Sequence, residues 1–133
     1  MSQENVEIVK QVMDAFNRAD ADFLVELATA DFEWFPGLPG TVEGSGYLGR
    51  EGIEAYLVEI RDTWEEIRIF GDEFRDLGSR VLVLGRAEGR GRGSGVPVET
   101  PHGFVVELRG GKISRVRTYL DHDEALLAVG LSE

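Results

Sequence analysis

Several residue types are scarce or missing in this 133-residue sequence. It has no cysteine and only two histidines, and no run of about 18 apolar residues that would cross a membrane as a helix. The lack of cysteine excludes disulfides, thiolate chemistry and cysteine-ligated zinc. The start, MSQENVEIVK, has no basic segment followed by an apolar one, so we expect no secretory signal, no membrane association and a cytoplasmic location. Without HExxH or HxH spacing, we expect neither a metal nor another cofactor.

Basic residues are also scarce relative to acidic ones. The chain has 14 lysines and arginines against 25 aspartates and glutamates, which gives a net charge of −11. A protein this acidic repels phosphate backbones, so we expect no nucleic-acid partner. We interpret the basic stretch GRAEGRGRGSG as a strand end with solvated arginines. With 42% hydrophobic and 29% charged residues, the chain is expected to form one globular domain over residues 1–133.

Helical periodicity dominates the first half of the sequence. Apolar residues recur at helical spacing over 3–17, and Asp20 is placed to cap a second, short helix. The spacing predicts a third helix over 50–64 and a last one over 123–130, which Gly130 would end.

Strand-like alternation dominates the second half. After a short strand in DFEWF, four segments alternate with period two and are separated by turn signals. The four segments are 66–76, 80–90, 96–108 and 112–120. Short hairpins between them predict an antiparallel sheet, with the helices on one face. The expected fold is α+β, in the order α-α-β-α-β-β-β-β-α, with a curved, cone-shaped antiparallel sheet wrapped on the N-terminal helices and a pocket at its mouth.

Five phrases in this order carry a family resemblance: AFNRADADFLVELATADFEW, YLGREGIEAYL, GRGSGVPVE, GFVVELRGGKISRVRTYLD and EALLAVGL. Over nearly its whole length the chain resembles the SnoaL-like family of the nuclear-transport-factor-2-like (ketosteroid-isomerase-like) superfamily. The resemblance implies a cone-shaped α+β fold that is often dimeric through its open sheet face. The superfamily includes ketosteroid isomerases, polyketide cyclases, limonene epoxide hydrolases, dehydratases and members that only bind, so fold alone does not choose a function.

Ketosteroid isomerase activity is not expected, because this sequence lacks the groups that the resemblance implies for it. The base of an Asp-Pro pair after the first strand is replaced by Phe35-Pro36. The tyrosine of the first helix corresponds to about Val12, and the aspartate of the penultimate strand to His102 or Gly103. Those groups move or stabilise the proton in the isomerase. An epoxide hydrolase of the limonene type is also a weak match, because only Arg117 and Asp121 are available for its relay.

The SnoaL-like cyclases imply an acid–base aspartate after the last strand, and Asp121 matches that position. Strand alternation puts His102 on one face with Phe104, Val106 and Leu108, which predicts that it points toward the core or pocket. We therefore predict Asp121 as base and His102 as acid or hydrogen-bond donor. Two alternatives stay open: His102 as a structural histidine, and Asp121 or Asp123 as a helix cap.

The DHD sequence at 121–123 is interpreted as a strand-to-helix junction and not as a metal site, with Asp121 inward and His122 exposed. Six residues are predicted to contact a ligand, with plain core packing as the alternative for the larger aromatic ones. They are Trp34, Tyr56, Trp64, Phe104, Val116 and Tyr119. Alternation also puts Tyr119 with Arg115 and Arg117, on the open sheet face.

Three functions are compatible with these observations. The first is a cofactor-independent acid–base lyase, isomerase or cyclase that acts on a small carbonyl-bearing molecule. The second is a binding domain for a small apolar organic ligand, without turnover. The third is an interaction domain that forms a homodimer through its open sheet face, where alternating arginines from Arg86 to Arg117 would pair with acidic residues of a second chain.

Overall fold

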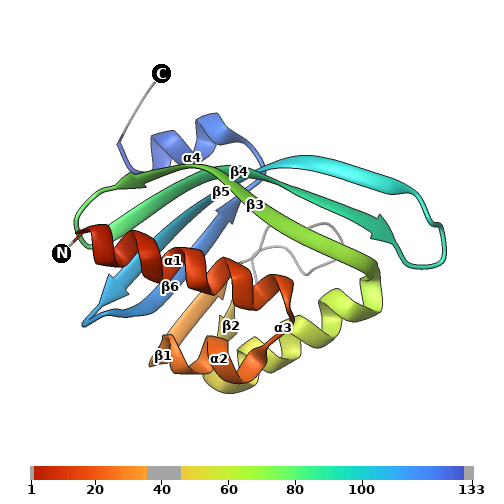
Figure 1. Ribbon diagram of the computed structural model, residues 1–133, viewed down its shortest axis with the longest axis horizontal. Coiled ribbons are helices and arrows are strands. Elements are labelled where there is room, and N and C mark those ends of the chain that lie inside the picture. Colours follow the sequence, from red (N-terminus) through yellow and green to blue (C-terminus); the bar gives the residue numbers. More distant parts are fainter. Residues whose placement is uncertain (1, 36–45, 131–133) are drawn as a thin grey trace.

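The computed structural model describes residues 2–35 and 46–130, which form helices and one sheet (Figure 1). The elements, in chain order, are α1 (Ser2–Asn17), α2 (Ala21–Glu26), β1 (Ala28–Phe35), β2 (Tyr47–Leu48), α3 (Gly49–Thr63), β3 (Trp64–Asp76), β4 (Arg80–Gly91), β5 (Pro97–Arg109), β6 (Lys112–Tyr119) and α4 (His122–Ala128). The predicted α+β order is confirmed. The two-residue strand β2 was not predicted, because a segment that short shows no alternation. None of the described helices is both long and apolar enough to span a membrane.

The predicted helix caps are present. The Asp20 side chain accepts a hydrogen bond from the Phe23 backbone N–H at 3.1 Å, which starts α2. Gly130 follows α4 with φ +81°, a left-handed conformation that ends a helix at little cost for glycine.

The sheet has six strands in the order β2-β1-β6-β5-β4-β3. The four long strands β3 to β6 pair antiparallel, as predicted. However, β1 runs parallel to β6, so the sheet is mixed. The chain passes from β1 through α3 and the four strands β2 to β5 before it reaches β6, and this long connection allows the parallel pairing.

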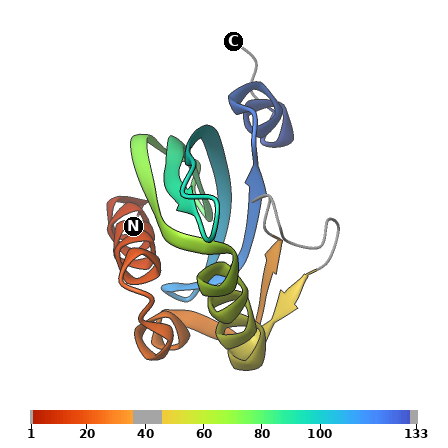
Figure 2. The ribbon, with the colours of Figure 1, turned by 90° about the vertical axis from the view of Figure 1, so that its right-hand side faces the viewer.

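The helices lie on both faces of the sheet, whereas the sequence predicted that all of them lie on one face. The main core lies between the sheet and the helices α1, α2 and α3, and it contains Val83, Phe104 and Val106. A second, smaller core lies between α4 and the other face, around Val105 and Leu126. Figure 2 shows α1 and α4 on opposite sides of the sheet. We call the face toward α1 the inner face and the face toward α4 the outer face.

A bulge bends the edge strand β3 near the middle of its length. The β3–β4 register shifts between Gly71 and Glu73, opposite Gly85. A Cβ atom on Gly85 would lie 1.8 Å from the carbonyl oxygen of Phe70, so the two strands approach closely only because residue 85 is glycine. Gly85 also pairs with His102 of β5, so the bend lies beside the predicted site histidine.

Candidate functional site

A small apolar cavity of about 20 Å³ lies on the inner face, between α1 and the sheet. Trp34, Phe104 and Val116, three of the predicted ligand contacts, line it together with Phe16. A cavity of this size holds about one water molecule. An organic ligand would therefore fit only after side chains move.

Aromatic rings extend from the cavity toward α3. The Tyr56 ring centroid lies 4.9 Å from that of Trp34 and 5.1 Å from that of Tyr47. Tyr56 is a predicted contact that is 2% exposed, and it packs against Trp34 instead of lining the cavity.

A polar pair that sequence reasoning missed lies beside this aromatic cluster. The Tyr47 hydroxyl donates to Glu59 Oε1 at 2.5 Å. Burial, and then the hydrogen bond to Glu59, raise the pKa of Tyr47 to about 12, so its hydroxyl stays protonated at neutral pH. No sequence pattern indicated this pair, because Tyr47 belongs to β2 and Glu59 to α3.

His102 lies on the inner face, as the alternation of β5 predicted. It is 1% exposed, and its ring meets that of Phe104 edge-on at 5.0 Å. Neither ring nitrogen has a hydrogen-bond partner in the described part of the chain. Burial, and then the nearby His122, lower the pKa of His102 to about 4, so the imidazole is neutral at pH 7. A neutral imidazole offers one donor and one acceptor nitrogen, and here both are unused.

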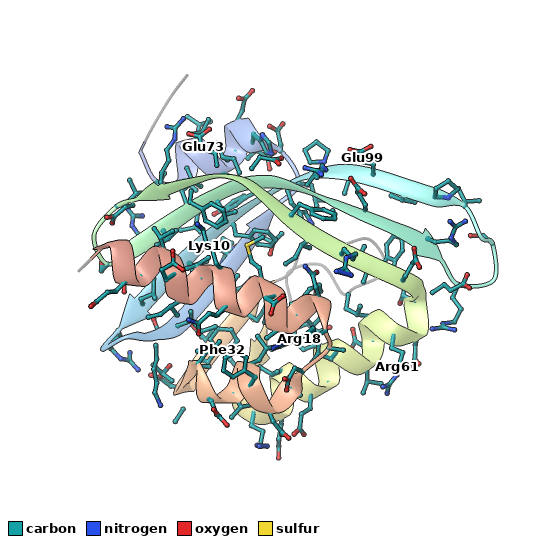
Figure 3. The ribbon with its side chains drawn as sticks, in the orientation of Figure 1. Lys10, Arg18, Phe32, Arg61, Glu73 and Glu99 are labelled. Carbon is teal, nitrogen blue, oxygen red and sulfur yellow. The ribbon has the colours of Figure 1, made fainter. Side chains whose placement is uncertain are left out.

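Trp64 lies apart from the interior cavity. It lines a larger hollow of about 540 Å³, which opens between α1, α3 and the start of β3. Arg61 of α3, labelled in Figure 3, belongs to the wall of this hollow. The indole N–H groups of Trp34 and Trp64 are buried, and within residues 2–35 and 46–130 neither has an acceptor.

The DHD segment differs from its prediction at two positions. Asp121 is exposed, and its carboxylate accepts from the Asp123 backbone N–H at 2.7 Å, so it caps α4. The expected inward orientation of Asp121 is wrong, because β6 ends at Tyr119 and the Asp121 carboxylate instead caps α4. His122 is partly buried, not exposed, and its Nε2–H donates to the Gly85 carbonyl at 2.7 Å.

Tyr119 lies on the outer face, away from the interior cavity. It packs against the small core under α4 and shares a hollow with Arg115 and Arg117. The structure therefore gathers Trp34, Phe104 and Val116 around the interior cavity and brings His102 beside Phe104. It does not bring Asp121 or Tyr119 to that cavity.

Comparisons with known proteins agree with this fold. Residues 9–116 match the family model described as SnoaL-like domain. An NTF2-like protein from Burkholderia xenovorans is 31% identical, with a TM-score of 0.75 over 91% of this chain and 92% of that one. TerC, crystallised with polyporic acid, is 25% identical, with a TM-score of 0.78 over 90% and 92% of the two chains.

A third similar structure is a proposed SnoaL-like polyketide cyclase from a Jannaschia species. It is 23% identical, with a TM-score of 0.77 over 96% of this chain and 90% of that one. The comparison with curated proteins gave no match. The chain belongs to the SnoaL-like family and has its nuclear-transport-factor-2-like fold.

Proposed function

We propose that this protein binds a small, largely apolar molecule with a carbonyl-type oxygen on the inner face of its sheet, and that His102 is the polar contact. The observation that carries the proposal is that His102 is buried against Phe104 of the apolar cavity wall, with neither ring nitrogen bonded to a described residue. Buried polar atoms in folded proteins nearly always have a hydrogen-bond partner. The two unbonded ring nitrogens of His102 therefore indicate that a ligand supplies the partner. A ligand oxygen can accept from the imidazole N–H.

The similarity to TerC supports this proposal, because that protein was crystallised with a small ligand, polyporic acid. The interior of this chain is suited to such a molecule, since the cavity wall is apolar and the buried His102 and Trp34 side chains each keep a donor that no described residue accepts from. We infer that Trp34, Phe104 and Val116 contact the apolar part of the ligand.

Acid–base turnover by a lyase, isomerase or cyclase is the enzymatic form of the same proposal, and we place it second. A general base works best with a pKa near the working pH, whereas the pKa of His102 is about 4. Asp121, the predicted base, is exposed and occupied as a helix cap. Ligand binding therefore accounts for more of the geometry than proton transfer between these two residues does.

Native mass spectrometry of freshly purified protein, followed by identification of the released compound, tests the proposal. We expect an apolar compound with a carbonyl-type oxygen. Its affinity should fall at least tenfold in His102→Phe, which keeps a ring of similar size but removes both nitrogens. His122→Gln is the control, because it keeps a donor for the Gly85 carbonyl. Equal affinity in His102→Phe and the unchanged protein would contradict the role of His102.

Formation of a homodimer through the outer face is a separate candidate function, and a row of charged residues favours it. Arg80, Glu107, Arg115 and Glu33 are direct neighbours across β4, β5, β6 and β1. The row alternates in sign and is basic at one end and acidic at the other. Two copies related by a two-fold axis would therefore place opposite charges against each other.

Light scattering over a range of concentrations tests the dimer. Arg115→Glu should weaken dimerisation at least tenfold, because it puts like charges into the paired rows. Arg50→Glu on α3, outside the outer face, is the matched control. A concentration-independent monomer mass for the unchanged protein would rule the dimer out.

A further inference from the structure

We propose that the hollow between α1, α3 and β3 is the outer compartment of the ligand site, and that Phe16 controls passage from it to the interior cavity. This inference rests on the proposed function, because it assumes a ligand that reaches the inner face. It adds the route, the shape of the ligand and the residue that selects for that shape.

The two spaces differ greatly in size, and only the hollow is large enough for an organic molecule. The interior cavity of about 20 Å³ is too small for an organic molecule. The hollow measures about 540 Å³, which lies within the range of small-molecule sites. Its lining includes the apolar residues Leu57, Ile60 and Ile67 as well as charged residues such as Arg61 and Glu66. Together the two spaces have the volume and the lining of a ligand site.

Phe16 separates the two spaces. Among the described residues it is the only one that lines both the hollow and the interior cavity. Its ring is 5% exposed and lies 5.9 Å from the Trp34 ring and 6.1 Å from the Tyr56 ring, between centroids. Rotation of this one side chain into the hollow would join them.

Hydrogen bonds fix the backbone around Phe16. Passage between the two spaces therefore depends on movement of the Phe16 side chain. The next residue, Asn17, donates to the Ile69 carbonyl at 3.0 Å and accepts from the Ile69 N–H at 2.9 Å. Ala19 then takes a left-handed conformation with φ +56°, and Asp20 caps α2. These contacts fix the end of α1 against β3 (Figure 1).

Each compartment is lined by a tryptophan whose buried indole N–H has no acceptor in the described part of the chain. The Trp34 indole belongs to the wall of the interior cavity, and the Trp64 indole belongs to the wall of the hollow. An indole N–H can only donate. The chemical class that matches is therefore a flat, elongated, largely apolar molecule with an acceptor oxygen, thin enough to pass the Phe16 ring.

The two tryptophans, the only ones in the chain, allow a direct test, because each reports on one compartment. We would use 6-bromo-1-tetralone, an apolar aromatic ketone whose bromine quenches indole fluorescence at short range. Trp64→Phe leaves Trp34 as the interior reporter, and Trp34→Phe leaves Trp64 as the reporter of the hollow. We expect quenching of both, Trp64 first and Trp34 later.

Phe16→Ala, made in the Trp64→Phe background, should raise the rate of Trp34 quenching about ten- to hundredfold, because it removes the need to wait for a minor open state. Phe16→Leu is made in parallel, since it keeps an apolar side chain and should give a smaller increase. Leu127→Ala is the control, because Leu127 is exposed on α4 and lines neither the hollow nor the interior cavity, and it should leave the rate unchanged.

The outcomes separate this inference from the proposed function. If Trp34 is quenched at the same rate in all Phe16 variants, the ligand enters by another route, and this inference alone fails. If only Trp64 is quenched, or neither tryptophan is, the probe never reaches the interior, and the result counts against both proposals.

Discussion

Burial keeps His102 neutral, and it makes the folded protein less stable at acidic pH. Its pKa falls from the ordinary 6.5 to about 4 in the folded chain, because the charged ring would lie among apolar side chains. The unfolded chain therefore binds more protons than the folded one between these two pH values. Stability is unaffected by this group above about pH 6.5 and declines as the pH falls toward 4.

The expected loss from His102 is about 3 kcal/mol of unfolding free energy between pH 7 and pH 4, from the shift of 6.5 to about 4. Denaturant unfolding at several pH values measures it. In His102→Phe this part of the loss of unfolding free energy between pH 7 and pH 4 should disappear. His122→Gln should keep most of it. Parallel pH profiles for His102→Phe and the unchanged protein would mean that the imidazole is not protected from protonation.

The sequence predicted the orientation of a single side chain well only where the residue lies inside a strand. His102 lies in the middle of β5, and its inward orientation followed from the alternation with Phe104. Asp121 follows the end of β6 and took up the alternative capping role that the sequence also allowed. Tyr47 and Glu59 meet across the fold, and no local pattern reports such a contact.

Among the elements, the connection between α1 and β3 depends on one side chain. Both polar atoms of Asn17 bond to the backbone of Ile69, in a partly buried place. Asn5, on the same helix, makes one exposed bond to the Gly78 carbonyl. The two residues are a natural comparison, because they share residue type and helix but differ in burial and in the number of bonds.

Asn17→Ala should lower the unfolding free energy by about 2 kcal/mol, because it removes two hydrogen bonds and leaves backbone groups of Ile69 unpaired. Asn5→Ala should cost about 0.5 kcal/mol or less, as an exposed substitution does. Chemical denaturation of the three proteins measures both values. Equal costs at the two positions would mean that the α1–β3 connection does not depend on this clamp.

The sequence predicted which segments form helices and strands, but only part of how these elements are arranged. The periods of 3.6 and 2 identified the long helices and strands and the antiparallel pairing of β3 to β6. The parallel pairing of β1 with β6 joins segments about 80 residues apart in the sequence, and no short-range signal reports it. The position of α4 on the outer face escaped prediction too, because its apolar stripe is equally suited to either face.

For the molecule as a whole, the family and fold are established, and the functional proposal concerns what enters the inner face. The net charge of −11 opposes anionic polymers, while the interior combines an apolar wall with a neutral histidine. The account therefore depends on one contact, between His102 and an oxygen of a small ligand.

The most direct measurement of that contact is the imidazole ¹⁵N spectrum of the protein with and without the compound identified by native mass spectrometry. The chain has only two histidines, so both can be followed. The account predicts that binding shifts the His102 nitrogens and leaves His122, bonded to the Gly85 carbonyl, nearly unchanged. A saturated complex in which the His102 nitrogens keep their unliganded positions would contradict it.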